Sequence, residues 1–255
     1  MDGAEPFELP VKKTDKTVLL LHGLTGTPSE MLYLGEQLHK EGFHVFIPLH
    51  PGHGINIKEL NRTTWQEIYA SVEKLYLEIR ANFDNVFVAG LSMGGVLALK
   101  LAMDYNGEIK GVASLSTPMQ FAGWKPKVFL PLARFTGLKH IYPDLPKLED
   151  DVADKEDLED THVCYDRVSI KAAISIVKLM KIVRSKLPKI RTPLLVMQST
   201  LDTTVEFKSV DIIYNGVSSS IKKRIILENS LHTITVDVEK DKVAKNVIDF
   251  FEARL

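Results

Sequence analysis

The sequence contains a single cysteine, Cys164, among its 255 residues. One thiol excludes an internal disulfide framework and a zinc site built from four thiolates, and it fits a reducing compartment. No apolar run approaches the roughly twenty residues that are needed to span a bilayer. The first ten residues, MDGAEPFELP, are acidic and contain prolines, unlike a signal peptide. We therefore expect a cytoplasmic protein without a transmembrane segment.

The sequence also has no excess of one charge. It contains 32 Lys and Arg residues and 33 Asp and Glu residues, which gives a net charge of −1. Without a basic excess, neither nucleic acid nor an anionic membrane is predicted as the main partner. Hydrophobic residues make up 45% and charged residues 25%, which is typical of a globular protein. A chain of this length can bury a sizeable core.

Six short apolar runs are predicted to be strands, and most are apolar throughout, as in parallel strands covered on both faces. They are residues 17–22, 44–49, 86–90, 111–116, 194–198 and 224–227. Helical segments alternate with them, two of which begin at capping boxes, 27–30 and 64–67. Further helices are predicted over residues 95–105, 168–187, 205–215 and 243–251. This alternation predicts a doubly wound, mostly parallel α/β sheet.

Residues 119–192 break this rhythm. They begin with an apolar, aromatic stretch, continue with eight acids among residues 149–160 and end in a long helix. The acidic stretch is expected to be a solvated loop, since it lacks the spacing of a calcium site. We predict a core made of residues 1–118 and 193–255, with 119–192 inserted as a helical cap over a pocket.

The motif Gly90-Leu91-Ser92-Met93-Gly94 lies between a predicted buried strand and a predicted buried helix. In that context G-x-S-x-G indicates a nucleophile elbow, a sharp turn that exposes a serine hydroxyl. Gly90 and Gly94 remove side chains that would collide in such a turn. Chance occurrence in a glycine-rich turn is the alternative, and the position between strand and helix disfavours it.

A serine nucleophile needs a base and an acid that orients the base. Asp202 lies 110 residues after Ser92, and His232 lies 30 residues further on. Each follows a predicted strand, so both fall at the edge where open α/β sheets build their sites. Asp202 alone could be a helix cap and His232 a surface residue, but their order after Ser92 matches the catalytic template.

The other histidines have simpler interpretations. His39 is expected on a helix face, His44 at the start of a strand, and His140 and His162 in the insertion. His50 and His53 in HPGHG could suggest a metal pair, but no third ligand is spaced to complete it, so no metal is predicted.

An oxyanion hole needs two N–H donors directed at one point. The residue after the nucleophile, Met93, supplies the first by its position. The second is expected in the loop His22-Gly23-Leu24-Thr25-Gly26, and we choose Leu24, because Gly23 and Gly26 allow its peptide to turn inward.

Five segments together resemble the bacterial carboxylesterases and monoacylglycerol lipases of the α/β-hydrolase superfamily. They are LHGLTG, HPGHG, GLSMGG, IIYNGVSSSIKK and LENSLHTITVD. The likeness runs from Val18 to the C-terminus and is weak in the insertion before about Val168. Thr200-Leu201 and the acidic loop depart from the family pattern, so substrate specificity is not transferred.

The resemblance implies an α/β-hydrolase fold with Ser92 as nucleophile, Asp202 as acid, His232 as base, and the N–H groups of Leu24 and Met93 as oxyanion hole. It further implies hydrolysis of short- to medium-chain esters or monoacylglycerols through an acyl-enzyme, without a cofactor. The expected partner is a small ester with an apolar acyl group, and the chain is expected to be a monomer or dimer.

The apolar side of the insertion could accommodate an acyl chain. Its residues are Phe121, Trp124, Phe129, Leu130, Leu132 and Phe135, and the alternative is that they only pack the cap on the body. Other functions stay open: hydrolysis of carbon–carbon bonds or amides, acyl transfer to another acceptor, or a receptor with slow turnover. A purely structural module leaves the ordered Ser, Asp and His unexplained.

Overall fold

The computed structural model describes residues 1–122, 144–146, 152 and 163–255. Seven strands form one sheet in the order β1-β3-β2-β4-β5-β8-β9, parallel throughout except where β1 pairs with β3. Their bounds are β1 (Phe7–Leu9), β2 (Lys16–Leu21), β3 (His44–Ile47), β4 (Asn85–Leu91), β5 (Gly111–Leu115), β8 (Leu194–Ser199) and β9 (Lys222–Leu227). The predicted doubly wound, mostly parallel sheet is confirmed.

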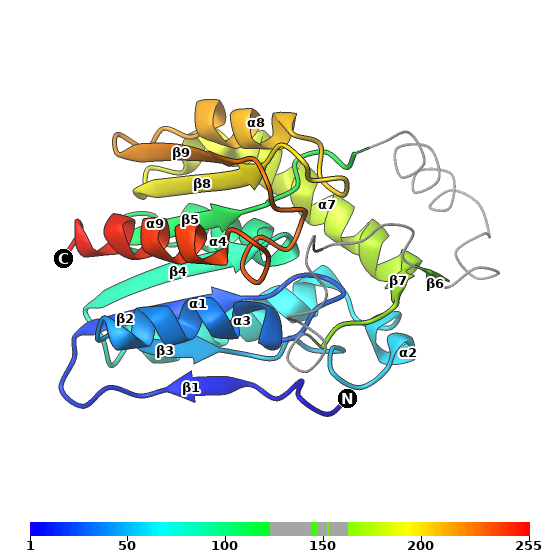
Figure 1. The fold of residues 1–255 in the computed structure, drawn as a ribbon, viewed down its shortest axis with the longest axis horizontal. Helices are drawn as coiled ribbons and strands as arrows, with labels where there is room; N and C mark the ends of the chain where they lie inside the picture. The colour runs from blue at the N-terminus through cyan, green and yellow to red at the C-terminus, as the bar shows by residue number, and fades with distance from the viewer. Residues whose placement is uncertain (123–143, 147–151, 153–162) are drawn as a thin grey trace.

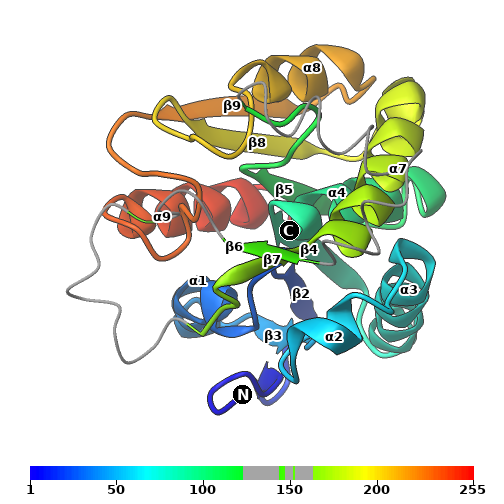
Figure 2. The ribbon, with the colours of Figure 1, turned by 90° about the vertical axis from the view of Figure 1, so that its right-hand side faces the viewer.

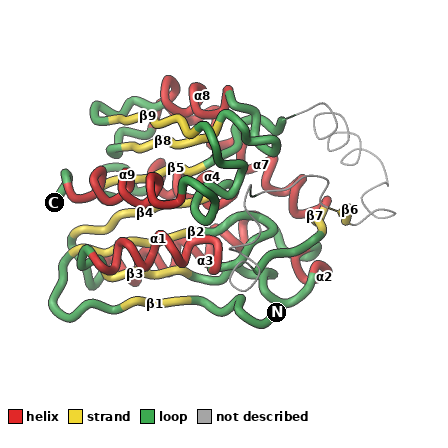
Figure 3. Tube along the Cα trace, in the orientation of Figure 1, coloured by secondary structure: helices red, strands yellow, loops and turns green. Residues whose placement is uncertain are grey.

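Helices cover both faces of this sheet (Figure 2). On one face lie α1 (Ser29–Lys40) and α9 (Lys240–Glu252), and on the other lie α3 (Trp65–Arg80), α4 (Met93–Asp104) and α7 (Ile170–Lys186). The remaining elements are α2 (Ile57–Leu60), α8 (Lys208–Gly216), the 3₁₀ turn η1 (Leu187–Lys189) and the short antiparallel strands β6 (Asp144–Pro146) and β7 (Arg167–Ser169). Figure 3 shows the strands enclosed by these helices.

Alternation along each strand divides the apolar residues between two cores. In β2, Leu19 and Leu21 belong to the core under α3, α4 and α7, whereas Val18 and Leu20 belong to the core under α1 and α9. All four are fully buried. Because both faces are covered, such a strand reads as a continuous apolar run in the sequence.

One predicted capping box forms and the other does not. The Thr64 hydroxyl accepts the N–H of Glu67, whose carboxylate accepts the N–H of Thr64, so α3 begins as predicted. At α1 the prediction is wrong: the helix starts at Ser29 without a side-chain cap. The Thr27 hydroxyl instead donates to the carbonyl of Val163, and the Glu30 carboxylate accepts the N–H of Gly23 in the loop that precedes the helix.

The described end of the predicted insertion is bound to the body of the protein. The N–H of Val163 donates to Ser29 Oγ (3.0 Å), and the N–H of Tyr165 donates to the carbonyl of Thr25 (2.8 Å). The long helix predicted there is α7, which packs on α3 and α4. Figure 1 shows β6 and β7 beyond one end of the sheet's strands. The division into core and cap at residues 119–192 stays a prediction.

Two predicted features of that insertion fall largely outside the described residues. Within the acidic stretch 149–160 only Val152 is described, and it is buried against Val236. Most of the predicted apolar side chains also lie outside the described ranges. Within the described ranges, no helix has the length and apolar character that crossing a membrane requires.

Three phenylalanine rings join α9 to the sheet. Phe251 on α9 lies 4.7 Å from Phe87 between ring centroids, and Phe87 lies 5.8 Å from Phe43. All three are fully buried. Such aromatic contacts stabilise a core beyond the area that they bury.

We expect Phe251→Ala to lower the free energy of unfolding by about 3–5 kcal/mol, because it leaves a cavity in the core. Phe207→Ala is the matched control, since Phe207 is 37% exposed and should cost far less. Urea unfolding followed by circular dichroism measures both. Equal losses for the two variants would contradict the role of this cluster.

Candidate active site

Ser92 occupies a strained turn between β4 and α4. It has φ 53° and ψ −115°, a region that residues with side chains rarely adopt. A Cβ atom on Gly90 would lie 2.2 Å from the carbonyl carbon of Gly94, and one on Gly94 would lie 2.0 Å from the carbonyl oxygen of Leu21. The turn can therefore form only with glycine at both positions.

Asp202 and His232 meet beyond the ends of β8 and β9. The two carboxylate oxygens of Asp202 lie 3.1 and 3.0 Å from Nδ1 of His232. Both side chains are buried, at 0% and 8% exposure. Because a carboxylate only accepts hydrogen bonds, Nδ1 carries the proton in the neutral imidazole, and Nε2 is left as the basic nitrogen.

The same carboxylate also caps a turn. Asp202 Oδ1 accepts the backbone N–H groups of Thr204 (3.0 Å) and Val205 (2.9 Å), and Gln198 Nε2 approaches Oδ2 at 3.5 Å. The sequence suggested Asp202 as a helix cap, and that alternative is wrong: Asp202 caps this turn, while α8 has Phe207 as its N-cap and no side-chain cap. These bonds hold the carboxylate in one orientation, and the turn delays the start of α8 to Lys208.

The loop before His232 is bound to a second carboxylate, which sequence reasoning missed. Glu239 Oε2 accepts the N–H groups of Glu228 (3.1 Å), Asn229 (2.9 Å) and Ser230 (3.1 Å). Burial alone would raise the pKa of Glu239, but these N–H donors and the nearby Lys242 lower it below its usual value. The ionised carboxylate thus fixes the backbone that leads to His232.

Ser92 lies at the same carboxyl edge of the sheet as this pair. The strands β4 and β8 are separated only by β5, which corresponds to about 10 Å at ordinary strand spacing. Ser92 Oγ forms no hydrogen bond with another described residue. The structure therefore joins Asp202 to His232 directly, while a contact between Ser92 and His232 stays a prediction.

The loop after β2 lies beside Ser92, because a Cβ atom on Gly23 would be 3.7 Å from Ser92 Cβ. Among the described residues, neither the N–H of Leu24 nor that of Met93 has a hydrogen-bond acceptor. The arrangement is suited to the predicted oxyanion hole. Gly23 and Gly26 do not have positive φ angles, so their role here is to leave space for close neighbours rather than to reverse the chain.

Three buried histidines pack behind this loop, with ring centroids 4.1 Å apart for His22 and His50 and 5.0 Å apart for His22 and His53. Burial is the main cause that lowers the pKa of all three, in the case of His50 to about 3, so they are neutral. The N–H of His50 donates to Nε2 of His22, so Nδ1 of His22 carries the proton and donates to the carbonyl of Gly23 (2.9 Å).

The HPGHG motif alone suggests His50 and His53 as a metal pair, and it does not reveal their contact with His22. Within the described part of the chain, no three potential ligands are arranged to hold a metal ion. The hydrogen bonds of His22 and His53 to the backbone make them part of the loop's support. The residues His140 and His162 lie outside the described ranges.

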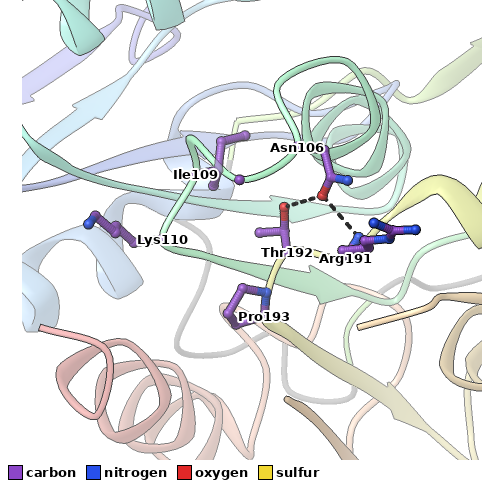
Figure 4. A pocket seen from close by; sticks show the side chains of 7 residues that line it. Asn106, Ile109, Lys110, Arg191, Thr192 and Pro193 are labelled. Carbon is purple, nitrogen blue, oxygen red and sulfur yellow. Dashed lines mark hydrogen bonds between the residues drawn. The ribbon is translucent and has the colours of Figure 1, made fainter. Parts of the chain in front are cut away.

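A shallow depression lies at the opposite edge of the sheet, by the amino ends of β5 and β8 (Figure 4). There Asn106 Oδ1 accepts hydrogen bonds from the N–H of Arg191 (3.0 Å) and the hydroxyl of Thr192 (3.4 Å). These contacts join two loops. The depression is therefore separate from Ser92, Asp202 and His232.

Of the apolar side chains predicted to contact an acyl group, only Phe121 is described. It forms an isolated β-bridge with Val205, next to the turn that Asp202 caps. The start of the predicted insertion is thereby fixed near Asp202. Trp124, Phe129, Leu130, Leu132 and Phe135 lie outside the described residues.

Comparison with known proteins gives consistent matches. The family described as serine aminopeptidase, S33, matches residues 12–239. The thermostable monoacylglycerol lipase of Bacillus sp. (strain H-257) is 32% identical over 252 residues, covering 98% of this chain and 95% of that protein. The carboxylesterase of Bacillus subtilis (strain 168) is 29% identical over 248 residues, covering 97% and 96%.

A solved structure from a study of LipS and LipT, two metagenome-derived lipolytic enzymes, superposes with a TM-score of 0.89 at 25% identity and covers 99% of both chains. The fold of this chain is therefore that of the lipolytic α/β-hydrolases. The family match extends over most of the sequence and includes the elbow, the acid and the histidine. The chain belongs to the serine aminopeptidase S33 family of α/β-hydrolases.

Proposed function

We propose that this protein is a serine hydrolase that cleaves carboxylic esters, with Ser92 as nucleophile, His232 as base and Asp202 as acid. The observation that carries the proposal is the buried Asp202–His232 pair at the sheet edge where the elbow presents Ser92. Relatives named as a monoacylglycerol lipase and a carboxylesterase support ester hydrolysis.

In the proposed first step, Nε2 of His232 accepts the proton of Ser92 while Oγ attacks the ester carbonyl. Asp202 holds the proton on Nδ1 and stabilises the imidazolium that forms. The N–H groups of Leu24 and Met93 donate to the oxyanion, and His232 then protonates the leaving alcohol. Water attacks the acyl-enzyme in the same way, which releases the acid and restores Ser92.

The finer substrate assignment rests on the apolar character of residues 121–142 and on the relatives. We propose short- to medium-chain acyl esters or monoacylglycerols as substrates, with the segment 119–192 as a cap over the acyl group.

The mechanism uses side chains, backbone N–H groups and water, without a cofactor. A location in the cytoplasm fits the single cysteine, and both a monomer and a dimer are compatible with the proposal.

Ser92→Ala should lower kcat by at least about 10³-fold, because the members of a triad act as a unit. The exposed Ser71 on α3 provides the control variant Ser71→Ala, which should retain full activity. Steady-state hydrolysis of a p-nitrophenyl ester measures both, and circular dichroism checks the fold. Undiminished turnover by Ser92→Ala would refute the assignment, and a single burst from the wild type would indicate a receptor.

Asp202→Asn should lower kcat by about 10⁴-fold, the loss found for this change in a comparable triad, because it disturbs the tautomer of the histidine. The amide oxygen can still accept the N–H groups of Thr204 and Val205, so the melting temperature should change little. Asp249→Asn on the exposed side of α9 is the control. A variant at 202 with normal kcat would contradict the role of the acid.

We expect a graded preference across acyl lengths, because an apolar pocket gains only about 1–3 kcal/mol per methylene at best. Values of kcat/KM for p-nitrophenyl esters from acetate to dodecanoate, together with 1-monoacylglycerol, test this expectation. A strict optimum at one chain length would contradict it.

A further inference from the structure

A buried carboxylate contacts the loop that carries the predicted oxyanion donor. We call residues 23–26 the oxyanion loop. Glu30, the second residue of α1, is 4% exposed, and its Oε2 accepts the N–H of Gly23 at 3.0 Å. A Cβ atom on Gly26 would lie 1.9–2.1 Å from the carboxylate atoms of Glu30. The first and last residues of the loop, Gly23 and Gly26, therefore both lie against this carboxylate.

Other groups fix the carbonyls of the same loop. The carbonyl of Gly23 accepts from His22 Nδ1 (2.9 Å), that of Leu24 lies 2.8 Å from His53 Nε2, and that of Thr25 accepts from the N–H of Tyr165 (2.8 Å). A carbonyl and the next N–H point in opposite directions across a trans peptide. The bonds on either side of Leu24 therefore determine where its N–H points.

We propose that Glu30 is a positioning residue for the oxyanion hole. The N–H of Gly23 belongs to the His22–Gly23 peptide, which Glu30 therefore holds in place. The next peptide along the chain carries the N–H of Leu24, so Glu30 sets the direction of that N–H. It touches no reacting atom. This inference rests on the proposed ester hydrolysis and on Leu24 as a donor.

The direction of the Glu30 side chain favours this role over a local one. A carboxylate in the first turn of a helix could cap its own helix, but this side chain contacts the loop and leaves α1 without a side-chain cap. A negative charge near a forming oxyanion opposes that charge. The benefit of Glu30 must therefore come from geometry, which a neutral acceptor of the same shape can reproduce.

The first experiment compares Glu30→Ala with Glu30→Gln. The alanine variant should lose kcat on the order of 10²-fold with KM nearly unchanged, since a displaced donor affects the transition state most. The glutamine variant should recover most of that loss, because its amide oxygen can accept the N–H of Gly23. Glu36→Ala, an exposed position on the same helix, is the matched control and should equal the wild type.

The second experiment approaches the same contact from the loop. Gly26→Ala places a Cβ atom where the Glu30 carboxylate lies, so it should displace the carboxylate and lower kcat as Glu30→Ala does. The double variant combines Gly26→Ala with Glu30→Ala. It has no carboxylate for the new Cβ atom to collide with, so its kcat should be no lower than that of Glu30→Ala alone. Such non-additivity is the signature of two residues that act through one contact.

Labelling of Ser92 with a fluorophosphonate gives the active fraction for each variant. A trifluoromethyl ketone, which forms an oxyanion adduct with a serine nucleophile, should bind more weakly in proportion to the loss of kcat.

If Glu30→Ala does not fold, Gly26→Ala and Glu30→Gln still decide the question. Wild-type kcat in Glu30→Ala or Gly26→Ala, a loss confined to KM, or additive losses in the double variant would overturn the proposal.

The role of Glu30 and the proposed function fail in different ways. Wild-type turnover that depends on Ser92 is measured first, and its absence would refute ester hydrolysis itself. If that turnover is present while the Glu30 and Gly26 variants are normal, only the positioning role is refuted.

Discussion

The close approach of the β4–α4 turn to the carboxyl end of β2 is the contact on which the rest of the site depends. Gly94 lies so near the carbonyl of Leu21 that no side chain fits between them. This contact holds Ser92 in its strained conformation and brings the loop after β2 beside it. The two predicted oxyanion donors, on separate segments of the chain, can share one target only because these backbones touch.

Carboxylates that accept backbone N–H groups fix the loops around this contact. Glu30 holds the loop after β2, Asp202 holds the turn after β8, and Glu239 holds the loop that leads to His232. Hydrogen bonds from N–H groups to an ionised acceptor are stronger than those between neutral groups. Segments without regular secondary structure can thus be held rigidly at the sheet edge.

Much of the fold and the pairing of Asp202 with His232 could be predicted from the sequence, because they depend on local patterns. Buried parallel strands appear as continuous apolar runs, and the positions of Asp202 and His232 follow from the order of strands. The edge strand β1 was not predicted, because three residues between Pro6 and Pro10 are too short a run to show alternation. It forms through its pairing with β3, which is a tertiary contact.

The partners of Glu30 and Glu239 escaped prediction for a related reason. Thr27 and Glu30 have the spacing of a capping box, yet Val163 binds the threonine hydroxyl and Gly23 binds the glutamate. Val163 is remote in the sequence, and Gly23, seven residues before Glu30, lies outside the spacing of a capping box. A capping-box spacing predicts a contact only where no other group competes for the same side chain.

The position of β9 at the end of the sheet has a consequence for self-association. Lys222, Lys223 and Arg224 occupy the first half of this strand, and the last two are exposed. Two copies that approached through this edge would bring like charges together, which disfavours strand addition and aggregation. Arg224 is paired with Asp211 of α8, so the charges of Lys222 and Lys223 are the ones that oppose such an approach.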